Sequence, residues 1–220
     1  MSSSASELHG VAPGLGLRLA LPAGASDTPE EALPAIDVSA IAGAKVALLR
    51  GVEADELSLR AVCVTAPSRQ WVTGLEELVL DRASGLVRGG LGVAIERWEA
   101  GPIHARSQRF EQAFEGAGRA GARAVVIRGQ HVLGFAGSEH DAALCSLACL
   151  EPAQGTGDRC GALLGATAFE GAFVAPPEPG LLVRTIFLAA EQPLAMTAAL
   201  GVLAAAGVTV LLARRPRPRP

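Results

Sequence analysis

Residues 57–63 read LSLRAVC, and this short alternating stretch sets the fold class. Its odd-numbered positions, from Leu57 to Cys63, are apolar, whereas Ser58 and Arg60 between them are polar. Side chains of a β-strand point alternately to its two faces, so the pattern predicts a strand with one face in a core.

Similar segments recur along the first 150 residues. Phe110 and Phe114 share one face of a predicted strand, opposite Arg109 and Glu111. Further strands are expected at residues 15–21, 45–51, 92–100, 122–128, 131–136 and 142–150. The short Gly129-Gln130 connection reads as a hairpin turn, which favours antiparallel pairing.

Two helices are expected beside these strands. Thr73 and Glu76 have the spacing of a capping box, in which each side chain binds a free backbone N–H of the first turn. Gly85 is the expected end of that helix. A second helix is expected from about Asp158 to Phe169. The sequence therefore predicts an α+β fold with a mainly antiparallel sheet on about two helices, plus a C-terminal single transmembrane helix.

The C-terminal end is apolar without interruption. Residues 194–213 read LAMTAALGVLAAAGVTVLLA and carry no charge. A helix of that length spans ~30 Å, the thickness of the bilayer's hydrocarbon core. Four arginines follow it, namely Arg214, Arg215, Arg217 and Arg219. The alternative is a buried C-terminal helix, but a core helix is usually amphipathic, and we favour the membrane.

This reading divides the chain into four parts. Residues 1–174 form the α+β domain, 175–192 a Pro-rich spacer and juxtamembrane segment, 193–213 the membrane helix and 214–220 a basic Arg/Pro tail. Gly201 and Ala205 have the small-residue spacing that lets two membrane helices approach, so a homodimer through this helix is an open alternative.

Two rules disagree on which side of the membrane the domain lies. The first 26 residues have no basic region followed by a continuous apolar run, because Arg18 interrupts the apolar stretch, and this favours a cytosolic domain. The arginines after the span argue for the opposite topology, since positive charge next to a span prefers the cytoplasmic side. We expect a single-pass membrane protein with its domain in the cytosol.

Four cysteines mark disulfide or thiol positions: Cys63, Cys145, Cys149 and Cys160. They are buried apolar residues if the domain is cytosolic, and two disulfides if it is exported. A disulfide between Cys149 and Cys160 would close a short loop. A zinc site that adds His140 is the third alternative, although the spacing does not fit the usual ligand pairs.

Other motifs are weak. The run 116–121 fits G-x-G-x-x-G, but a strand pattern follows it where a nucleotide site needs a helix, so we expect a loop. Residues 138–141 read SEHD and look like a polar turn. The remaining histidines, His9, His104 and His131, are single residues, and Trp98 is expected to pack on a strand.

Net charge is −3, from 19 basic and 22 acidic residues, which gives no electrostatic support for nucleic-acid binding. No catalytic, cofactor or metal site is assigned, and whether the protein is an enzyme is left open, leaning to no. We expect a membrane-tethered binding or accessory protein whose partners are the lipid bilayer and an unidentified protein. The alternative is a membrane-bound enzyme or redox protein that uses Cys145 and Cys149.

Overall fold

The computed structural model describes residues 4–12, 15–21, 24–39, 43–54, 56–67, 76–106, 108–136, 141–155 and 158–175. The chain divides into two units, Met1–Pro177 and Glu178–Pro220, and every described residue belongs to the first. The elements run in the order β1 (Ser4–Ala12), β2 (Leu15–Leu21), β3 (Ser26–Thr28), the 3-10 helix η1 (Glu30–Ala32), β4 (Lys45–Ala54), β5 (Leu57–Pro67), α1 (Glu76–Gly90), β6 (Ala94–Arg106), β7 (Arg109–Ala120), β8 (Arg123–Ala136), β9 (Asp141–Pro152), α2 (Arg159–Gly165) and β10 (Ala168–Gly171). The expected α+β class, with a mainly antiparallel sheet and two α-helices in the described part, is confirmed.

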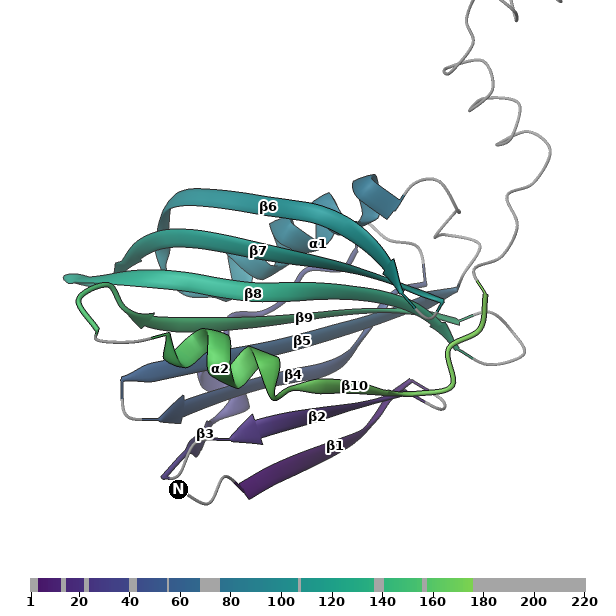
Figure 1. Ribbon diagram of the computed structural model, residues 1–220, viewed down its shortest axis with the longest axis horizontal. Helices are drawn as coiled ribbons and strands as arrows, with labels where there is room; N and C mark the ends of the chain where they lie inside the picture. The colour runs from purple at the N-terminus through teal and green to yellow at the C-terminus, as the bar shows by residue number, and fades with distance from the viewer. Residues whose placement is uncertain are drawn as a thin grey trace, which may run out of the picture. The chain divides into compact units, whose positions relative to one another are not determined.

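Seven strands form the large sheet, in the order β3-β4-β5-β9-β8-β7-β6 with every neighbouring pair antiparallel (Figure 1). Strand β9 lies at its centre, and residues 142–150 are buried on both faces. Alternate residues of β9 therefore belong to different cores.

The first core lies under a second, three-stranded sheet of order β1-β2-β10. Leu15, Leu17 and Leu19 of β2 pack against β5 and β9, and Cys160 of α2 joins the same cluster. The alternation predicted from residues 57–63 is confirmed, because Leu57, Leu59, Ala61 and Cys63 all point into this core.

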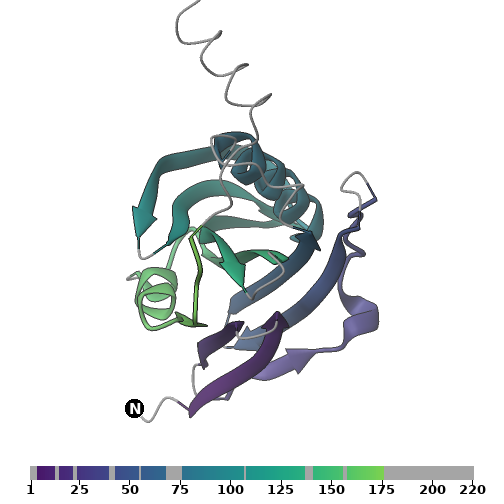
Figure 2. The ribbon, with the colours of Figure 1, turned by 90° about the vertical axis from the view of Figure 1, so that its right-hand side faces the viewer.

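Helix α1 covers the opposite face of the large sheet (Figure 2). Val79, Leu80 and Ala83 pack on the ends of β8 and β9, and Val87 packs farther along. The expected end at Gly85 is wrong, since α1 continues to Gly90. Its buried stripe continues past this glycine, and packing outweighs the roughly 1 kcal/mol helix penalty of one glycine. Thr73 of the predicted capping box lies outside the described residues.

The predicted hairpin at Gly129-Gln130 is also wrong, because residues 123–136 form one continuous strand, β8. Gly129 pairs with Phe114 of β7, and a Cβ at this position would overlap the Phe114 ring and the Leu147 carbonyl oxygen. The glycine therefore makes room for an aromatic ring in the middle of the sheet and does not mark a turn.

The run 116–121 lies mostly in β7, where a loop was expected. A Cβ on Gly116 would lie 2.8 Å from the Arg97 carbonyl oxygen and 3.3 Å from the Trp98 ring. These glycines let β6 cross closely, and Gly121, with φ +61°, makes the turn to β8.

The second predicted helix is shorter than expected. Asp158 caps α2 by accepting a hydrogen bond from the Gly161 amide, close to the predicted start, but the helix ends at Gly165. Residues 168–171 form β10, which pairs with β2, and Phe169 packs against the first core. Strand pairing and apolar burial outweigh the helical pattern here.

In the part of the chain that the structure describes, no helix is long and apolar enough to cross a bilayer. The predicted span at 193–213, its flanking arginines, the spacer from residue 176 onward and the Gly201–Ala205 spacing lie outside the described residues.

Candidate functional site

The four cysteines form two disulfides. Cys63 and Cys145 lie opposite each other on the paired strands β5 and β9, with their Cα atoms 4.1 Å apart. Cys149 of β9 is bonded to Cys160 of α2, with a Cα separation of 5.6 Å. The exposed fraction of each cysteine is 4% or less. Strand β9 is therefore covalently tied to a neighbouring strand and to a helix.

This pairing separates Cys145 from Cys149. Both point to the same face of β9, four residues apart, but each is bonded to a different partner. Residues four apart on a strand are ~13 Å from each other, so these two cannot form a joint dithiol site while β9 keeps its conformation. Within the described ranges, no cluster of three His, Cys, Asp or Glu side chains could hold a metal ion. His140 of the zinc alternative lies outside those ranges.

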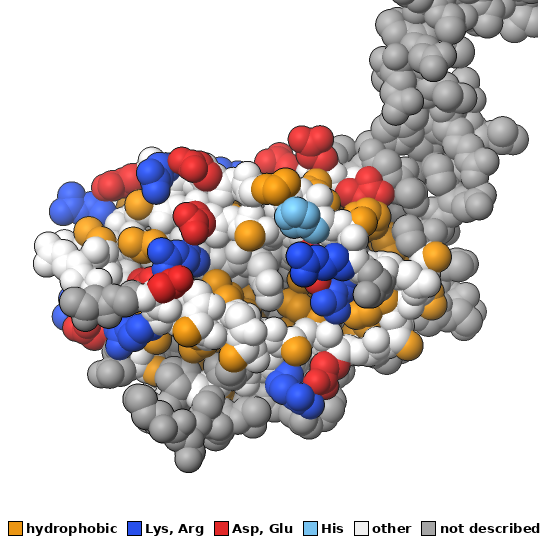
Figure 3. Space-filling view, in the orientation of Figure 1, with side chains coloured by type: hydrophobic (Ala, Val, Ile, Leu, Met, Phe, Trp, Pro, Cys, Tyr) orange, Lys and Arg blue, Asp and Glu red, His pale blue; other side chains and the backbone are white. Residues whose placement is uncertain are grey.

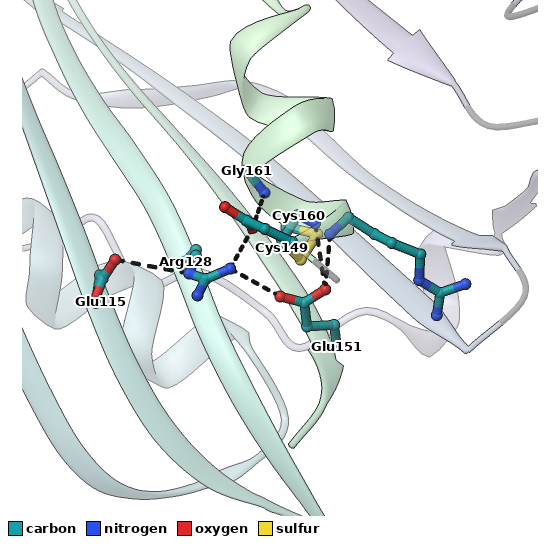
Figure 4. Close-up of polar contacts among 8 residues, drawn as sticks. Glu115, Arg128, Cys149, Glu151, Cys160 and Gly161 are labelled. Carbon is teal, nitrogen blue, oxygen red and sulfur yellow. Dashed lines mark hydrogen bonds and ion pairs between the residues drawn. A yellow bond between two sulfur atoms is a disulfide. The ribbon is translucent and has the colours of Figure 1, made fainter. Parts of the chain in front are cut away.

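A polar cluster surrounds the Cys149–Cys160 disulfide (Figure 4). Glu151, near the end of β9, is only 7% exposed. One of its carboxylate oxygens accepts a hydrogen bond from Arg128 at 3.0 Å. The other accepts from the backbone N–H groups of Arg159 and Cys160 at 3.2 and 3.3 Å.

Asp158 completes this cluster. Its carboxylate accepts from the Gly161 amide at 2.7 Å and also pairs with Arg128. A third acidic residue, Glu115 of β7, reaches Arg128 at 3.6 Å. The first turn of α2 thus finds its acceptors inside the protein, and the cluster fixes α2 on the sheet together with the disulfide.

A second polar group lies between α1 and the large sheet. His131 of β8 is fully buried; its Nε2 lies 2.9 Å from Ser84 Oγ of α1, and its Nδ1 lies 2.7 Å from Ser146 Oγ of β9. Phe114 packs on the His131 ring at a centroid distance of 4.5 Å, and Trp98 stacks on Phe114 at the same distance.

Burial lowers the pKa of His131 from 6.5 to about 4. The imidazole is therefore neutral at pH 7, with one ring nitrogen donating and the other accepting. Ser84 and Ser146 satisfy both, so one serine hydroxyl donates to the ring and the other accepts from it. Both ring nitrogens lie within hydrogen-bond distance of serine hydroxyls in a closed environment, so this group links α1 to the sheet.

Sequence reasoning treated His131 as a single residue and did not identify its serine partners. Ser84 and Ser146 are 47 and 15 residues away in the chain, and only the pairing of β8 with β9 places Ser146 opposite His131. A polar residue within an otherwise apolar strand face was the available signal. His104 is exposed on β6, and the His9 side chain and residues 138–140 of the SEHD turn are not described.

The two sheets leave a small apolar cavity of about 10 Å³ between them. Its lining includes Gly134, Cys145, Phe169 and Phe173. Such a volume is at the lower limit of what holds one water molecule. The Phe173 ring lies directly over Gly134, where a Cβ would overlap it, and Val174 donates a backbone hydrogen bond to Phe135 at 2.9 Å. Phe173 and Val174 are therefore held against the end of β8 by a ring contact and a hydrogen bond.

The surface carries charges of both signs. Figure 3 shows basic and acidic side chains interspersed over the visible face, without a large area of one sign. Several form ion pairs between neighbouring strands, such as Arg50 with Asp27 at 2.7 Å and Arg60 with Glu53 at 2.6 Å. The carboxylate of each of these pairs is exposed to solvent, which weakens the attraction.

No family model matches the chain, and no curated protein matches it. Among solved structures, the chain is similar to LpqN, a protein involved in cell envelope biogenesis of Mycobacterium tuberculosis, with 12% sequence identity and a TM-score of 0.44. The similarity covers 77% of this chain and 91% of that one.

Proposed function

We propose that the chain is a single-pass membrane protein whose disulfide-bonded domain lies in an oxidising compartment and serves as a non-catalytic binding or accessory module. The observation that carries the proposal is the pairing of all four cysteines in buried disulfides. Disulfides persist in exported proteins and are rare in the cytosol. This departs from the cytosolic location that the N-terminal sequence favoured.

The predicted tail agrees with that topology. Four arginines follow the apolar segment 194–213. Positive charge next to a span prefers the cytoplasmic side, so an exported domain and a cytoplasmic tail satisfy this rule together. The disulfides and the arginines are independent of each other, and both favour the same orientation.

The two cysteines proposed for a redox role and the one fully buried histidine of the described residues are all held in closed, structural contacts. Cys145 and Cys149 are in separate buried disulfides, and His131 is enclosed by two serines and an aromatic ring. These environments favour the binding or accessory role over a redox role for Cys145 and Cys149.

The test counts thiols and locates the domain in one preparation of the full chain. Cells are quenched in acid, denatured and treated with a maleimide that adds mass to each free thiol. A disulfide-bonded domain adds no mass unless a reductant is used first. Four additions without reductant would show a reduced domain and overturn the export proposal.

Lys45 locates the domain independently, because it is the one lysine of the sequence and is exposed at the start of β4. A membrane-impermeant amine reagent applied to intact spheroplasts should label the Lys45 side chain of the wild-type protein, and Lys45→Arg should lose that label while the N-terminal amine can still react. Labelling of Lys45 only after lysis would place the domain on the cytosolic side. Recovery of the chain in the supernatant after centrifugation would reject the membrane tether itself.

A further inference from the structure

The large sheet has two lateral borders, and they differ in how they are protected. One is β6, which has two register irregularities along its pairing with β7. It also contains Pro102 and the charged residues Glu96, Arg97 and Glu99. Bulges, proline and charge are the usual means by which an edge strand avoids pairing with another chain.

The other border is only half covered. Strand β3 pairs with Gly51, Val52 and Glu53 of β4, and within the described residues no strand pairs with the outer side of residues 45–49. This stretch reads KVALL and has one register irregularity, at Ala47, and one charge, Lys45. Of the two borders it is the less protected.

The space beside this stretch is open. Val46 is 39% exposed, more than any other large apolar side chain that the structure describes. Lys45 and Ala47 are exposed as well. Leu48 packs partly against the first core, so Val46 and Ala47 are the apolar side chains of this edge that another extended chain can reach.

We infer that residues 45–49 pair antiparallel with the same residues of a second copy, so that two seven-stranded sheets join across a twofold axis. Charge restricts the register. A register centred between Ala47 and Leu48 would place Lys45 opposite Arg50 of the other copy, and like charges directly opposite each other are unfavourable.

A register centred on Ala47 avoids this contact between like charges and pairs all five residues from 45 to 49. It places Lys45 opposite Leu49 and Val46 opposite Leu48, and it ends before the part of β4 that β3 covers. Val46 then faces Leu48, Ala47 faces Ala47, and no two charged side chains lie opposite each other, so the strand can pair with itself as a twofold interface requires.

The strength of this contact rests on the proposed membrane tether. Five residues span about 17 Å of strand, a smaller contact than a stable interface between free proteins. Confinement of two copies to one membrane raises their effective concentration and compensates for the small area. We therefore expect pairing in membranes and weak association in dilute detergent.

Engineered cysteines test the register. In the inferred pairing the two Ala47 residues are directly opposite, with Cα atoms about 5 Å apart, within reach of a disulfide. Two Lys45 residues are offset by four positions, about 13 Å, which is beyond that reach. The full-length Ala47→Cys and Lys45→Cys variants, each reconstituted in phospholipid vesicles, are oxidised mildly and compared on non-reducing gels.

The expected result is a disulfide-linked dimer for Ala47→Cys at a yield at least tenfold above that of Lys45→Cys. Equal yields, or monomer for both while each cysteine reacts with a small maleimide, would overturn the inference. Val46→Glu, introduced with Ala47→Cys, should abolish the dimer by placing a charge in the contact. Failure of the chain to enter vesicles would instead reject the tether, which flotation measures separately.

Discussion

The buried histidine predicts a specific pH dependence of stability. Folding lowers the pKa of His131 from 6.5 to about 4. The unfolded chain therefore binds a proton at this residue as the pH falls through 6.5, whereas the folded protein binds it only near pH 4. The stability that the neutral ring contributes is fully present above pH 6.5 and is lost between pH 6.5 and 4.

The magnitude follows from the two pKa values. Each pKa unit corresponds to about 1.4 kcal/mol, so the free energy of unfolding should fall by about 3 kcal/mol between pH 7 and pH 4 because of this residue. Carboxylates also titrate in this range, and the His131→Gln variant isolates the histidine because it keeps their contribution. The difference in unfolding free energy between wild type and variant should shrink by about 3 kcal/mol over that interval.

Urea unfolding of the oxidised full chain in mild detergent, followed by tryptophan fluorescence, measures this difference at several pH values. His104→Gln changes an exposed histidine of β6 and controls for the loss of a histidine as such. A difference between wild type and His131→Gln that stays constant from pH 7 to pH 4 would refute the buried neutral imidazole. An NMR titration of the His131 ring in the folded protein gives an independent reading.

Three further predictions use the same unfolding assay. Replacing both cysteines of the β9–α2 disulfide by alanine should lower the free energy of unfolding by about 3 kcal/mol. The same change at the β5–β9 disulfide should lower it by about 4.5 kcal/mol, because that disulfide closes a longer loop. Equal losses would contradict the dependence on loop length. Gly129→Ala should cost about 2 kcal/mol or more, since its methyl group would overlap the Phe114 ring and a backbone oxygen, whereas Gly85→Ala, in open space on α1, should stabilise by about 0.5–1 kcal/mol. Glu151→Gln should lower the free energy of unfolding by about 1–3 kcal/mol, because a charged acceptor of three hydrogen bonds is lost. Glu115→Gln, which removes one exposed carboxylate, should change it by less than about 0.5 kcal/mol. Similar effects of both changes would show that Glu151 does not hold α2.

The sequence predicted those elements that local pattern alone determines. Alternation identified β5, a strand was expected at β2, and the predicted start of the second helix near Asp158 agrees with α2. Gly85 was misread because the buried stripe of α1 continues past it, and Gly129 because glycine has two meanings: it can end an element, or it can make room for a neighbouring group. Only the position of Phe114 against Gly129 distinguishes these meanings, and that contact depends on how β7 pairs with β8.

The disulfide pairing and the polar groups around it could not be predicted from the sequence, for a similar reason. Four cysteines allow three pairings, and the strand register that selects one of them arises from the whole sheet. Cys63 meets Cys145 because β5 and β9 are neighbours, although β6, β7 and β8 lie between them in the chain. Glu151 accepts two backbone hydrogen bonds from α2 because that helix lies next to the end of β9.

The two disulfides also determine how the protein responds to proteolysis. A chain cut once between Cys63 and Cys145, or between Cys149 and Cys160, remains a single covalent molecule, and its fragments separate on a gel only after reduction. The stretch between these two loops, residues 146–148, lies in the buried centre of β9 and is closed to proteases in the folded state. A single cleavage that releases the intact domain from residues 178–220 must therefore fall after Cys160.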